Sequence, residues 1–516
     1  MTGLSPRPYQ IEEYTKTVCP HCFADRQRRS DEPDTFLDGM LVSHHGSIWM
    51  RRFCPYHGES ESLYERDEEI WRARSGWGTP TSQITPDRED NYRGFPEGYR
   101  DGLLVSHGQH TCILLLNVIE SCNYSCPTCY ASALPPGSPI ETSRLPSIEQ
   151  VVKTVDTVLK REAGKLGVVM ISGGEPTVRG DIEALLSALL ERNVTRIMLN
   201  TNGRRIASDD RFLKFLSENR NRIEVYLQFD GLRTETHVRL RGENVGKEKL
   251  LALQRLNQAG IFTTLVATVA RGVNDDEVGH LIELGLETPK CCGLAIQPMF
   301  GSGRTSIYDP NDRSTPTGVL RDLEKQTNGL LGWTDFIPLP CSYRDCCDIA
   351  YLLRTKQGWK SIASLIGRDE LRNWIHLVAN TISFDNASEA VKELVKNGVV
   401  QRVFSEQQKM NPLKLAADIL RMCECGPGCD CLPGLSELIL RPTEKLEKMA
   451  ENTFRITVKM FMDSHTFHDG RIRQCCVHVG TFEDDSRRHS FCWRWLFADA
   501  TDFPKSRLST MRVLNA

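Results

Sequence analysis

Three closely spaced cysteines, Cys122, Cys126 and Cys129, have the clearest chemical use in this chain of 516 residues. They lie in the stretch CNYSCPTC, with the spacing C-x3-C-x2-C. Three thiolates can hold a four-iron cluster while one iron keeps an open position for a small molecule. In isolation, the same pattern would also suit a zinc site or a structural cluster. The residues around it therefore have to decide between these uses.

Short apolar runs and helical patterns alternate around and after these cysteines. Apolar positions such as Val151, Val155 and Val158 recur with helical spacing between two of the runs. Such alternation predicts parallel strands joined by crossover helices, with ligands at the carboxyl ends of the strands. The six predicted strands are Ile113–Val118, Gly167–Ile171, Arg196–Asn200, Arg222–Phe229, Ile261–Ala270 and Gly293–Met299.

Glycines and polar side chains follow three of these strands at the ends where a ligand would bind. Paired glycines allow a backbone to approach a ligand closely. Amide and carboxylate side chains could hold a ribose. Taken singly, Asn-Gly and Asp-Gly are also ordinary turn formers, so the order of the loops is what carries the signal. The candidate cofactor-binding residues are Gly173, Gly174, Glu175, Pro176, Asn200, Asn202, Gln228 and Asp230.

With these motifs the chain resembles the radical SAM superfamily. The resemblance implies an α/β fold with a partial (βα)6 TIM-like barrel, and a 4Fe-4S cluster on Cys122, Cys126 and Cys129. It also implies that S-adenosylmethionine (SAM) is cleaved to a 5′-deoxyadenosyl radical, with the GGEP loop binding the methionine amino group. One departure is Thr128, where many members have an aromatic residue before the third cysteine, and here Tyr130 follows it.

Two metal-ligand knuckles precede the predicted barrel. Cys19 and Cys22 lie in CPHC, and Cys54 and His57 lie in CPYHG. Each knuckle offers two ligands on a tight turn, which together predict a tetrahedral site for zinc or a mononuclear iron. A filled four-ligand site has no position for substrate. We therefore expect a zinc-ribbon or rubredoxin-like module whose metal has a structural role.

Further cysteines follow the barrel in groups. The segment CECGPGCDC, from Cys423 to Cys431, could hold a further metal or form a loop without one. Cys291 and Cys292 are expected to be packing residues. Thiols from distant parts of the chain could hold at least one auxiliary iron-sulfur cluster, although one member of each adjacent pair could be a buried apolar thiol. The candidate auxiliary ligands are Cys341, Cys346, Cys347, Cys475, Cys476 and Cys492.

The length predicts two or three domains. We expect a metal module at residues 1–78, a linker at 79–111, the barrel at 112–304 and a helical, cysteine-rich domain at 305–516. Within that last domain, 352–403 and 412–449 are predicted to be largely helical. These helices could cover the barrel or line an apolar tunnel.

Composition restricts the partners and the compartment. The formal net charge is −3, the pI is about 6.5 and basic residues are scattered, so charge gives no case for nucleic acid. The amino terminus has no signal-peptide pattern, and no apolar run is long enough to span a membrane. We expect a cytoplasmic protein in which metal ligation, and not disulfide bonding, explains the high content of 19 cysteines, with peripheral membrane contact left open.

The flanking motifs carry a narrower resemblance. The stretches CPHC, CPYHG, IPLPCSYRDCC and FMDSHTFHDGRIRQCCVH closely resemble the radical SAM proteins that include archaeal tetraether lipid synthase. This implies a lipid substrate, a low-potential electron donor and coupling of two hydrocarbon chain ends. Because a methyl group has neither an acidic proton nor a leaving group, a cofactor-derived radical is needed to activate it.

The same family is also associated with methylation of a pterin precursor, a small-molecule substrate. That activity needs a polar pocket. The polar residues of one motif could line this pocket, or they could lie outside it at the surface or as supporting groups: Asp463, His465, His468, Asp469 and Arg471. A third class, a metal-binding or electron-transfer protein without catalysis, would leave the GGEP loop unexplained.

Overall fold

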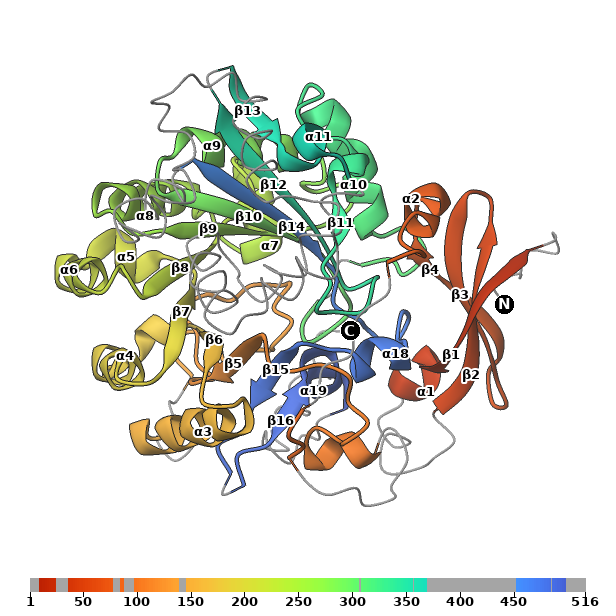
Figure 1. Ribbon diagram of the computed structural model, residues 1–516, viewed down its shortest axis with the longest axis horizontal. Coiled ribbons are helices and arrows are strands. Elements are labelled where there is room, and N and C mark those ends of the chain that lie inside the picture. The colour runs from red at the N-terminus through yellow and green to blue at the C-terminus, as the bar shows by residue number, and fades with distance from the viewer. Residues whose placement is uncertain are drawn as a thin grey trace, which may run out of the picture.

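Two β-sheets organise the protein (Figure 1). The computed structural model describes residues 9–24, 36–77, 84–87, 97–138, 145–305, 308–355, 357–368, 452–483 and 485–497. One sheet has four strands in the amino-terminal part. The other has 12 strands and contains the predicted barrel.

The centre of the large sheet consists of the six predicted strands, adjacent in sequence order and all parallel. This arrangement confirms the predicted α/β barrel. The strands are β5 (Ile113–Asn117), β6 (Leu166–Ser172), β7 (Val194–Thr201), β8 (Ile223–Gln228), β9 (Thr263–Val269) and β10 (Cys291–Pro298). The helices between them are α3 (Ile148–Arg161), α4 (Ile182–Leu190), α5 (Arg204–Ser208), α6 (Asp210–Glu218), α7 (Thr234–Arg241), α8 (Gly246–Gln258) and α9 (Val278–Glu287).

Helix α3 illustrates why the sequence forms these crossovers. Ser147 and Gln150 make a reciprocal capping box at its start, which satisfies backbone donors that a helix end leaves unpaired. Val151, Val155 and Val158 are fully buried on one face. That face packs with the apolar strand residues into the main hydrophobic core.

The carboxyl-terminal residues extend this sheet at both edges. Strand β14 (Thr453–Lys459) lies parallel to β10, and β15 (Val477–Gly480) lies parallel to β5. The large sheet therefore continues well past residue 304 in sequence. The other elements of this part are α10 (Pro316–Gln326), β11 (Ile337–Pro338), β12 (Cys347–Thr355), β13 (Gly358–Ser361), α11 (Ile362–Ile366), α18 (Asp469–Arg473), β16 (Arg488–Ser490) and α19 (Phe491–Phe497).

The predicted helix is wrong over residues 352–361, where β12 and β13 form an antiparallel hairpin. Strand β12 also pairs with β14, from Cys347 opposite Lys459 to Leu353 opposite Thr453. An apolar run such as that in β12 suits a buried helix or a buried strand equally well, and the pairing with β14 decides for the strand. The remaining predicted helices, from residue 369 to 449, lie outside the described residues.

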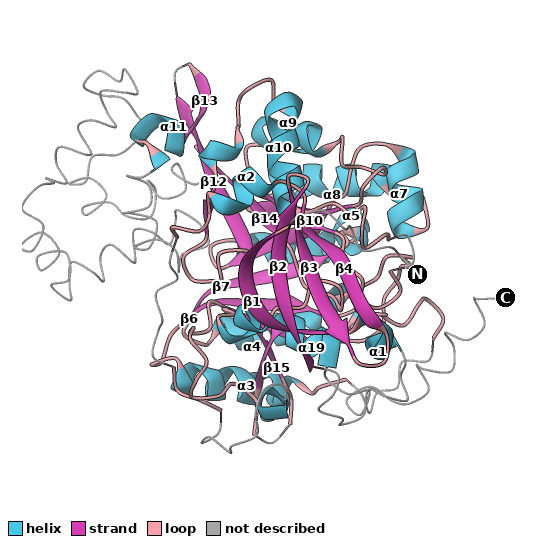
Figure 2. Ribbon diagram, turned by 90° about the vertical axis from the view of Figure 1, so that its right-hand side faces the viewer, coloured by secondary structure: helices cyan, strands magenta, loops and turns pink. Residues whose placement is uncertain are grey.

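The amino-terminal sheet is an antiparallel meander beside the barrel, seen face-on in Figure 2. The side chain of Arg74 joins it to the barrel, because it donates to Glu65 at 2.8 Å and to Asp348 of β12 at 3.1 Å. The elements here are β1 (Gln10–Val18), α1 (Pro20–Ala24), β2 (Phe36–His44), β3 (Ser47–Cys54), β4 (Gly58–Glu65) and α2 (Glu68–Arg72).

The expected linker at residues 79–111 makes contacts with distant parts of the chain where it is described, at 84–87 and 97–111. The Asp87 side chain is fully buried and forms ion pairs with Arg161 at 2.7 Å and Arg488 at 3.0 Å. Tyr99 and Leu103 lie in a hydrophobic cluster with carboxyl-terminal residues. The high content of turn residues suggested a loose connection, but these distant contacts fix the segment.

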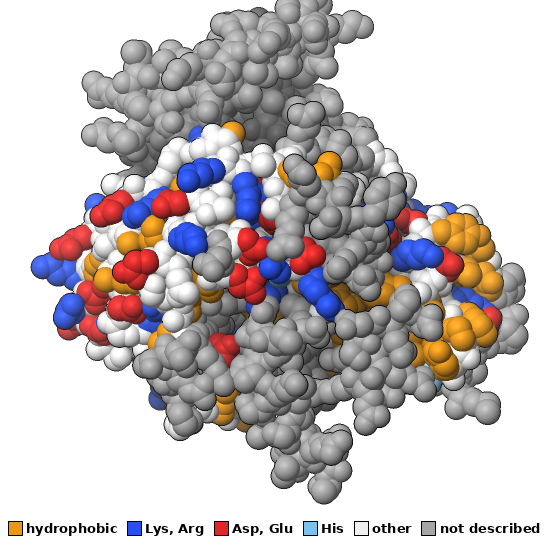
Figure 3. Space-filling view, turned by 90° about the horizontal axis from the view of Figure 1, so that it is seen from below, with side chains coloured by type: hydrophobic (Ala, Val, Ile, Leu, Met, Phe, Trp, Pro, Cys, Tyr) orange, Lys and Arg blue, Asp and Glu red, His pale blue; other side chains and the backbone are white. Residues whose placement is uncertain are grey.

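Charged side chains of both signs are interspersed on the described surface seen in Figure 3. This mixture agrees with the scattered charges of the sequence. Among the helices that the structure describes, none is long and apolar enough to cross a membrane.

Candidate active site

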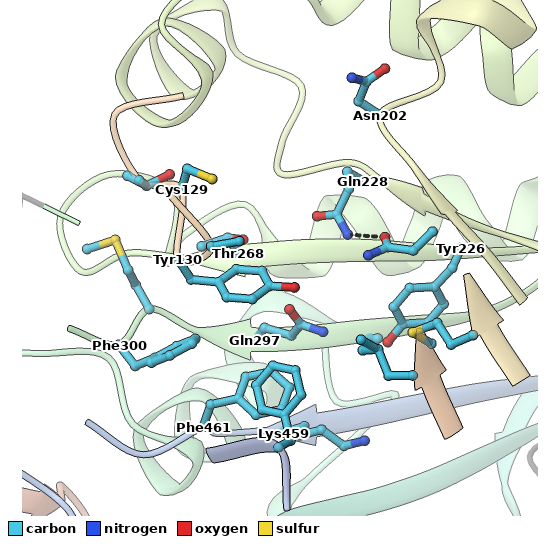
Figure 4. A pocket seen from close by; sticks show the side chains of 18 of the residues that line it. Cys129, Tyr130, Asn202, Tyr226, Gln228, Thr268, Gln297, Phe300, Lys459 and Phe461 are labelled. Atoms are coloured by element: carbon cyan, nitrogen blue, oxygen red, sulfur yellow. Dashed lines mark hydrogen bonds between the residues drawn. The ribbon is translucent and has the colours of Figure 1, made fainter. Parts of the chain in front are cut away.

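A cavity of about 210 Å³ lies inside the barrel (Figure 4). Each of the six central strands contributes lining residues, and so do β12, β14 and β15. The three motif cysteines and the GGEP loop line the same cavity. The carboxyl-terminal strands are thus part of the site as well as of the sheet.

The predicted cluster ligands Cys122, Cys126 and Cys129 lie together after β5. Burial is the main cause that raises the pKa of the Cys122 thiol to about 12, and the neighbouring Glu175, Cys126 and Cys129 contribute to the same rise. Burial also raises the pKa of Cys126, but the guanidinium of Arg241 hydrogen-bonds to this thiol and opposes the rise. Buried thiols beside one another are unfavourable as anions unless a metal neutralises them.

The two glycines of the GGEP loop allow this loop to press against the segment that leads to Cys122. The backbone N–H of Gly174 donates to the Ile119 carbonyl at 2.7 Å. A Cβ on Gly173 or Gly174 would lie 2.2 Å from the carbonyl oxygen of Ile119 or Ser121, respectively. A side chain at either position would therefore push the loop away from the cysteines.

The side chain of Glu175 accepts hydrogen bonds from its own loop and from the end of β7. Its Oε1 accepts hydrogen bonds from the Thr177 backbone N–H at 3.1 Å and from the hydroxyls of Thr177 at 2.6 Å and Thr201 at 2.7 Å. Its Oε2 accepts the Asn202 backbone N–H at 2.7 Å. The carboxylate thus joins the GGEP loop to the end of β7. Pro176 begins a short 3₁₀ turn and does not line the cavity.

The amides at the strand ends form a chain across the cavity wall. Gln228 donates to Asn200 at 2.8 Å, and Asn200 donates to Ser172 at 2.9 Å. Asn202 donates to Asn123, next to the first motif cysteine, at 2.6 Å. Gln228, Asn200 and Asn202 all line the cavity, as the prediction required of ligand-binding groups.

Asp230 differs from that prediction because it does not line the cavity. Its buried carboxylate accepts two hydrogen bonds from Arg241, at 2.6 and 2.5 Å, and one from the Thr268 N–H at 3.0 Å. Asp230 therefore holds Arg241, the residue that reaches the cavity and Cys126. A single arginine in a helix gave no sequence signal for this role.

Comparison with known proteins agrees with this geometry. Residues 116–285 match the radical SAM superfamily, and residues 11–66 match the HMPTM N-terminal zinc ribbon domain. The chain contains a radical SAM domain and, before it, a zinc ribbon domain. It is 26% identical over 93% of both chains to the 7,8-dihydro-6-hydroxymethylpterin dimethyltransferase of Methanocaldococcus jannaschii. It is 28% identical to GTP 3′,8-cyclase 3 of Mycobacterium bovis over 33% of this chain and 44% of that protein.

Among solved structures, Streptococcus suis SuiB aligns with a TM-score of 0.35 and 16% identity, over 43% of this chain and 49% of that one. Membership of the radical SAM superfamily implies a 4Fe-4S cluster and SAM. The site fits both groups. One buried and two partly buried thiols line one end of the cavity, and the glycine loop beside them leaves room for a cofactor to approach the backbone.

The zinc-ribbon residues are also brought together. The ligand atoms of Cys19, Cys22, Cys54 and His57 lie within 4.8 Å of one another. Cys22 Sγ is 3.6 Å from Cys54 Sγ and 3.3 Å from His57 Nδ1. A tetrahedral zinc with bonds of about 2.3 Å to sulfur requires ligand separations of roughly 3.8 Å. This geometry suits one ion.

A third group contains a cysteine that the sequence reasoning missed. The Sγ atoms of Cys112, Cys341 and Cys476 lie within 4.8 Å of one another, and all three residues are buried. Cys112 precedes β5, Cys476 precedes β15 and Cys341 follows β11. We call these three residues the seam triad, because they join elements from the two ends of the large sheet. Cys112 stands alone at the start of an apolar strand, so no spacing pattern marked it.

The other predicted auxiliary ligands separate from this triad. Cys346, Cys475 and Cys492 influence one another electrostatically, and Cys346 accepts a hydrogen bond from Arg471 at 3.3 Å. Cys347, in contrast, lines the cavity. The two members of each adjacent pair, Cys346 with Cys347 and Cys475 with Cys476, therefore have different surroundings, since neighbouring side chains point in different directions. Cys423, Cys425, Cys429 and Cys431 lie outside the described residues.

The polar motif between residues 463 and 471 does not line the cavity. Asp463 is fully buried and pairs with Arg313 at 2.9 Å, while His468 bonds to Glu13 of β1 at 3.2 Å. Asp469 accepts a hydrogen bond from Thr15 of β1 at 3.0 Å. These residues join the zinc ribbon to the barrel. They are supporting groups, and the polar side chains of the cavity come from other strands.

Proposed function

We propose that this protein uses a 5′-deoxyadenosyl radical to activate a C–H bond of a pterin-like heterocycle, which it then methylates. The mixed lining of the cavity carries this proposal. Gln297 and Tyr226 offer amide and phenol groups inside the barrel. A flat heterocycle with ring nitrogens and a carbonyl can form hydrogen bonds with such groups, whereas a hydrocarbon cannot.

An aromatic wall supports the same substrate class. The ring centroids of Phe461 and Phe491 are 4.2 Å apart, and those of Phe300 and Phe461 are 5.4 Å apart. Tyr130 lies 5.9 Å from Phe300. All four rings line the cavity, and Figure 4 shows Tyr130, Phe300 and Phe461 on the same side of it as Gln297. Aromatic faces of this kind pack against planar ligands.

When bound, SAM and the cluster supply the radical that removes a hydrogen atom from the substrate. In this proposal Cys122, Cys126 and Cys129 hold the cluster, and Gly173 and Gly174 let the methionine part of SAM approach the loop backbone. Asn200, Asn202 and Gln228 orient the ribose side. The apolar and aromatic side chains exclude water from the reacting carbon, which protects a reactive intermediate from side reactions.

The relative from M. jannaschii is named for dimethylation of a hydroxymethylpterin, and the match covers 93% of both chains. This similarity includes the zinc ribbon and the carboxyl-terminal strands as well as the radical SAM domain. It supports pterin methylation over the expectation of lipid coupling. The other lining residues, however, include an apolar set that also suits an alkyl chain: Ile113, Leu115, Met170, Met198 and Val477. Coupling of lipid chains is therefore the second candidate.

We further propose that the seam triad and the Cys346, Cys475 and Cys492 group hold auxiliary iron-sulfur clusters. Soft thiolates from several segments are the ligands that such clusters use. The cavity reaches Cys347 and Leu339, close to the seam triad, so an auxiliary cluster would lie near the substrate. A low-potential donor would supply the electrons, in keeping with free thiols and a reducing compartment.

Product analysis tests the proposed function. Anaerobically reconstituted enzyme is incubated with SAM, a low-potential reductant and either a reduced hydroxymethylpterin or an archaeal-type lipid extract, and products are identified by mass spectrometry. We expect deoxyadenosine together with a methylated pterin. Joined lipid chains with no pterin product would replace the proposal by the second candidate. Absence of deoxyadenosine in both mixtures, from enzyme with a full cluster, would contradict radical chemistry altogether.

A further inference from the structure

A lysine without a hydrogen-bond partner lies in the cavity wall. Lys459 is the last residue of β14, lines the cavity and is only half-buried (Figure 4). Among the residues that the structure describes, none accepts a hydrogen bond from its Nζ. An ammonium offers three donors, and leaving them without acceptors away from bulk water is costly. An acceptor that enters the cavity would therefore find the ammonium of Lys459 available to donate hydrogen bonds.

Arg455 lies two residues earlier and faces the same side, because side chains alternate along a strand. Its Nη2 donates to the Thr264 hydroxyl at 3.2 Å, but its Nη1 has no hydrogen-bond partner in the described parts of the chain. The nearest carboxylate, Glu224, is 3.8 Å away and is shared with Arg196, which lies 3.9 Å from it. The single carboxylate of Glu224 is therefore shared by the guanidinium groups of Arg455 and Arg196.

The balance of charge inside the cavity is strongly positive. Glu175 is the one carboxylate among the described lining residues, and the backbone and hydroxyl donors of the GGEP and β7 loops surround it. Arg241 is paired with Asp230. Neutral groups from Tyr226, Gln297 and Thr457 complete the cavity wall near Lys459. No carboxylate among the described lining residues pairs with Lys459, and the groups that interact with its ammonium are Tyr226 and the thiols of Cys347, Cys476 and Cys341.

We propose that Lys459, assisted by Arg455, binds an anionic group of the substrate, a carboxylate or a phosphate. This subsite rests on the proposed function, since it assigns one end of the pterin-like substrate. Phe461 lies two residues after Lys459 and belongs to the aromatic wall. A planar ring against that wall would carry its anionic substituent toward the lysine. A charge-assisted hydrogen bond at a site shielded from water gives both affinity and orientation.

The nearby thiols provide the competing explanation. Cys347 pairs with Lys459 across the β12 and β14 strands, and Cys341 and Cys476 are within electrostatic range of its ammonium. Burial raises the pKa of the Cys347 thiol to about 12, which keeps this thiol neutral. A metal-bound seam triad could instead make Lys459 a counter-ion of the auxiliary centre. These two roles predict different responses to substitution.

The test compares binding of three fluorescent ligands to the anaerobically reconstituted full-length enzyme with SAM present. The ligands are pterin, pterin-6-carboxylate and the phosphate ester of 6-hydroxymethylpterin. The proteins are the wild type, Lys459→Met, Lys459→Arg and Lys214→Met, a control on the exposed face of α6 whose side chain is 78% exposed. Iron content and the cluster spectrum are measured for each protein.

We expect the wild type and Lys214→Met to bind an anionic ligand about tenfold or more tightly than pterin. Preference for the carboxylate or for the phosphate identifies the source of the anion. Lys459→Met should lose the preference while retaining affinity for pterin, and Lys459→Arg should restore part of it. Equal binding of all three ligands by the wild type overturns the anion subsite and leaves the proposed function intact.

A change in iron content or cluster spectrum of Lys459→Met, with its ligand preference unchanged, also overturns the subsite in favour of the counter-ion role. If the wild type binds none of the three ligands, the pterin proposal itself is contradicted, and the subsite fails with it. The two failures therefore give different results.

Discussion

The carboxylate of Glu175 accepts the backbone N–H of Asn202 at 2.7 Å and thereby ties the GGEP loop to the end of β7. Both residues also line the cavity. The glutamate acts mainly within the protein, because its oxygens receive donors from Thr177 and Thr201 as well. The geometry of the GGEP loop consequently depends on this one side chain.

Replacing Glu175 with Gln should weaken SAM binding about tenfold while leaving the cluster iron in place. The new amide presents an N–H group toward donors where the carboxylate presented an acceptor, so the loop must rearrange. Equilibrium binding of SAM to the reconstituted protein measures the effect. Glu191→Gln, on a side chain that is 76% exposed, is the matched control. Unchanged SAM affinity in Glu175→Gln would refute the idea that SAM binding depends on the link that Glu175 makes between the GGEP loop and β7.

Replacing Cys126 with Ala should abolish formation of deoxyadenosine and remove about four irons per chain, since two thiolates remain for the catalytic cluster. Iron analysis and chromatography of SAM cleavage products test this expectation. Cys291→Ala is the control, because Cys291 is a buried thiol at the start of β10 that packs in the hydrophobic core. A Cys126→Ala protein with normal cleavage would rule out the proposed ligand set.

The adjacent cysteines 346 and 347 should respond differently to the same substitution. Cys346→Ala is expected to lower the auxiliary iron content, whereas Cys347→Ala should retain it, because Cys347 faces the cavity. Iron content and electron paramagnetic resonance spectra of the two variants provide the comparison. Equal iron loss in both would contradict the division of the pair.

The seam triad makes a further prediction for catalysis. Cys476→Ala should spare deoxyadenosine formation but lose product, because the catalytic cluster has its own three ligands. Normal product from this variant would exclude a catalytic role for an auxiliary centre there. An iron content near four per chain in the wild-type protein would argue against any auxiliary cluster.

Arg74 is expected to be important for stability. It is 1% exposed and lies among the carboxylates of Glu65, Asp345 and Asp348. Arg74→Met would leave buried negative charges unpaired, at a cost of about 3–5 kcal/mol. A lower midpoint of thermal unfolding should result. Arg211→Met, on a side chain 84% exposed, should leave the midpoint close to that of the wild type, and a similar midpoint in both variants would disprove this network.

The partly buried His465, which contacts Arg52 and Ser62 of the zinc ribbon, should make the stability of the protein sensitive to acid. Burial lowers the pKa of His465 to about 4, with Arg52 and Arg313 also lowering it. Since an unfolded histidine titrates near 6.5, the unfolded state binds the proton first, and stability should fall between about pH 6.5 and 4. The loss is at most about 1.4 kcal/mol per pH unit.

His465→Gln should therefore lose less stability than the wild type between pH 7.5 and 5.5 in denaturant unfolding. His280→Gln, at an exposed position on α9, controls for general acid effects. Parallel losses in His465→Gln and the wild type would show that other groups are responsible.

The barrel could be predicted from sequence because its signals are local. Apolar runs such as 113–118 and 167–171 formed strands where expected, and the capping box at Ser147 lies beside its helix. The edge strands β14 and β15 could not be predicted, because their partners β10 and β5 are distant in the chain. Non-local pairing leaves no periodic trace beyond that of any apolar segment.

The site shows the same division between local and distant information. The cysteine spacing and the glycine pair identified the cofactor end of the cavity. Arg241, Arg455 and Lys459 carried no motif, and their importance comes from what surrounds each charge in the fold. Cys112 was missed for a similar reason, because its partners Cys341 and Cys476 come from other segments.

The seam triad has a consequence for how the protein is made. Cys112 is synthesised before the barrel, whereas Cys476 and strand β15 are synthesised only after all six central strands. Until β15 has been synthesised, β5 is therefore an unpaired edge strand of the nascent barrel, and such an edge can pair with another chain. When β15 pairs with β5, it covers that edge and also brings Cys476 next to the other two thiols of the seam triad. A truncated chain would expose an aggregation-prone strand in addition to losing its thiol group.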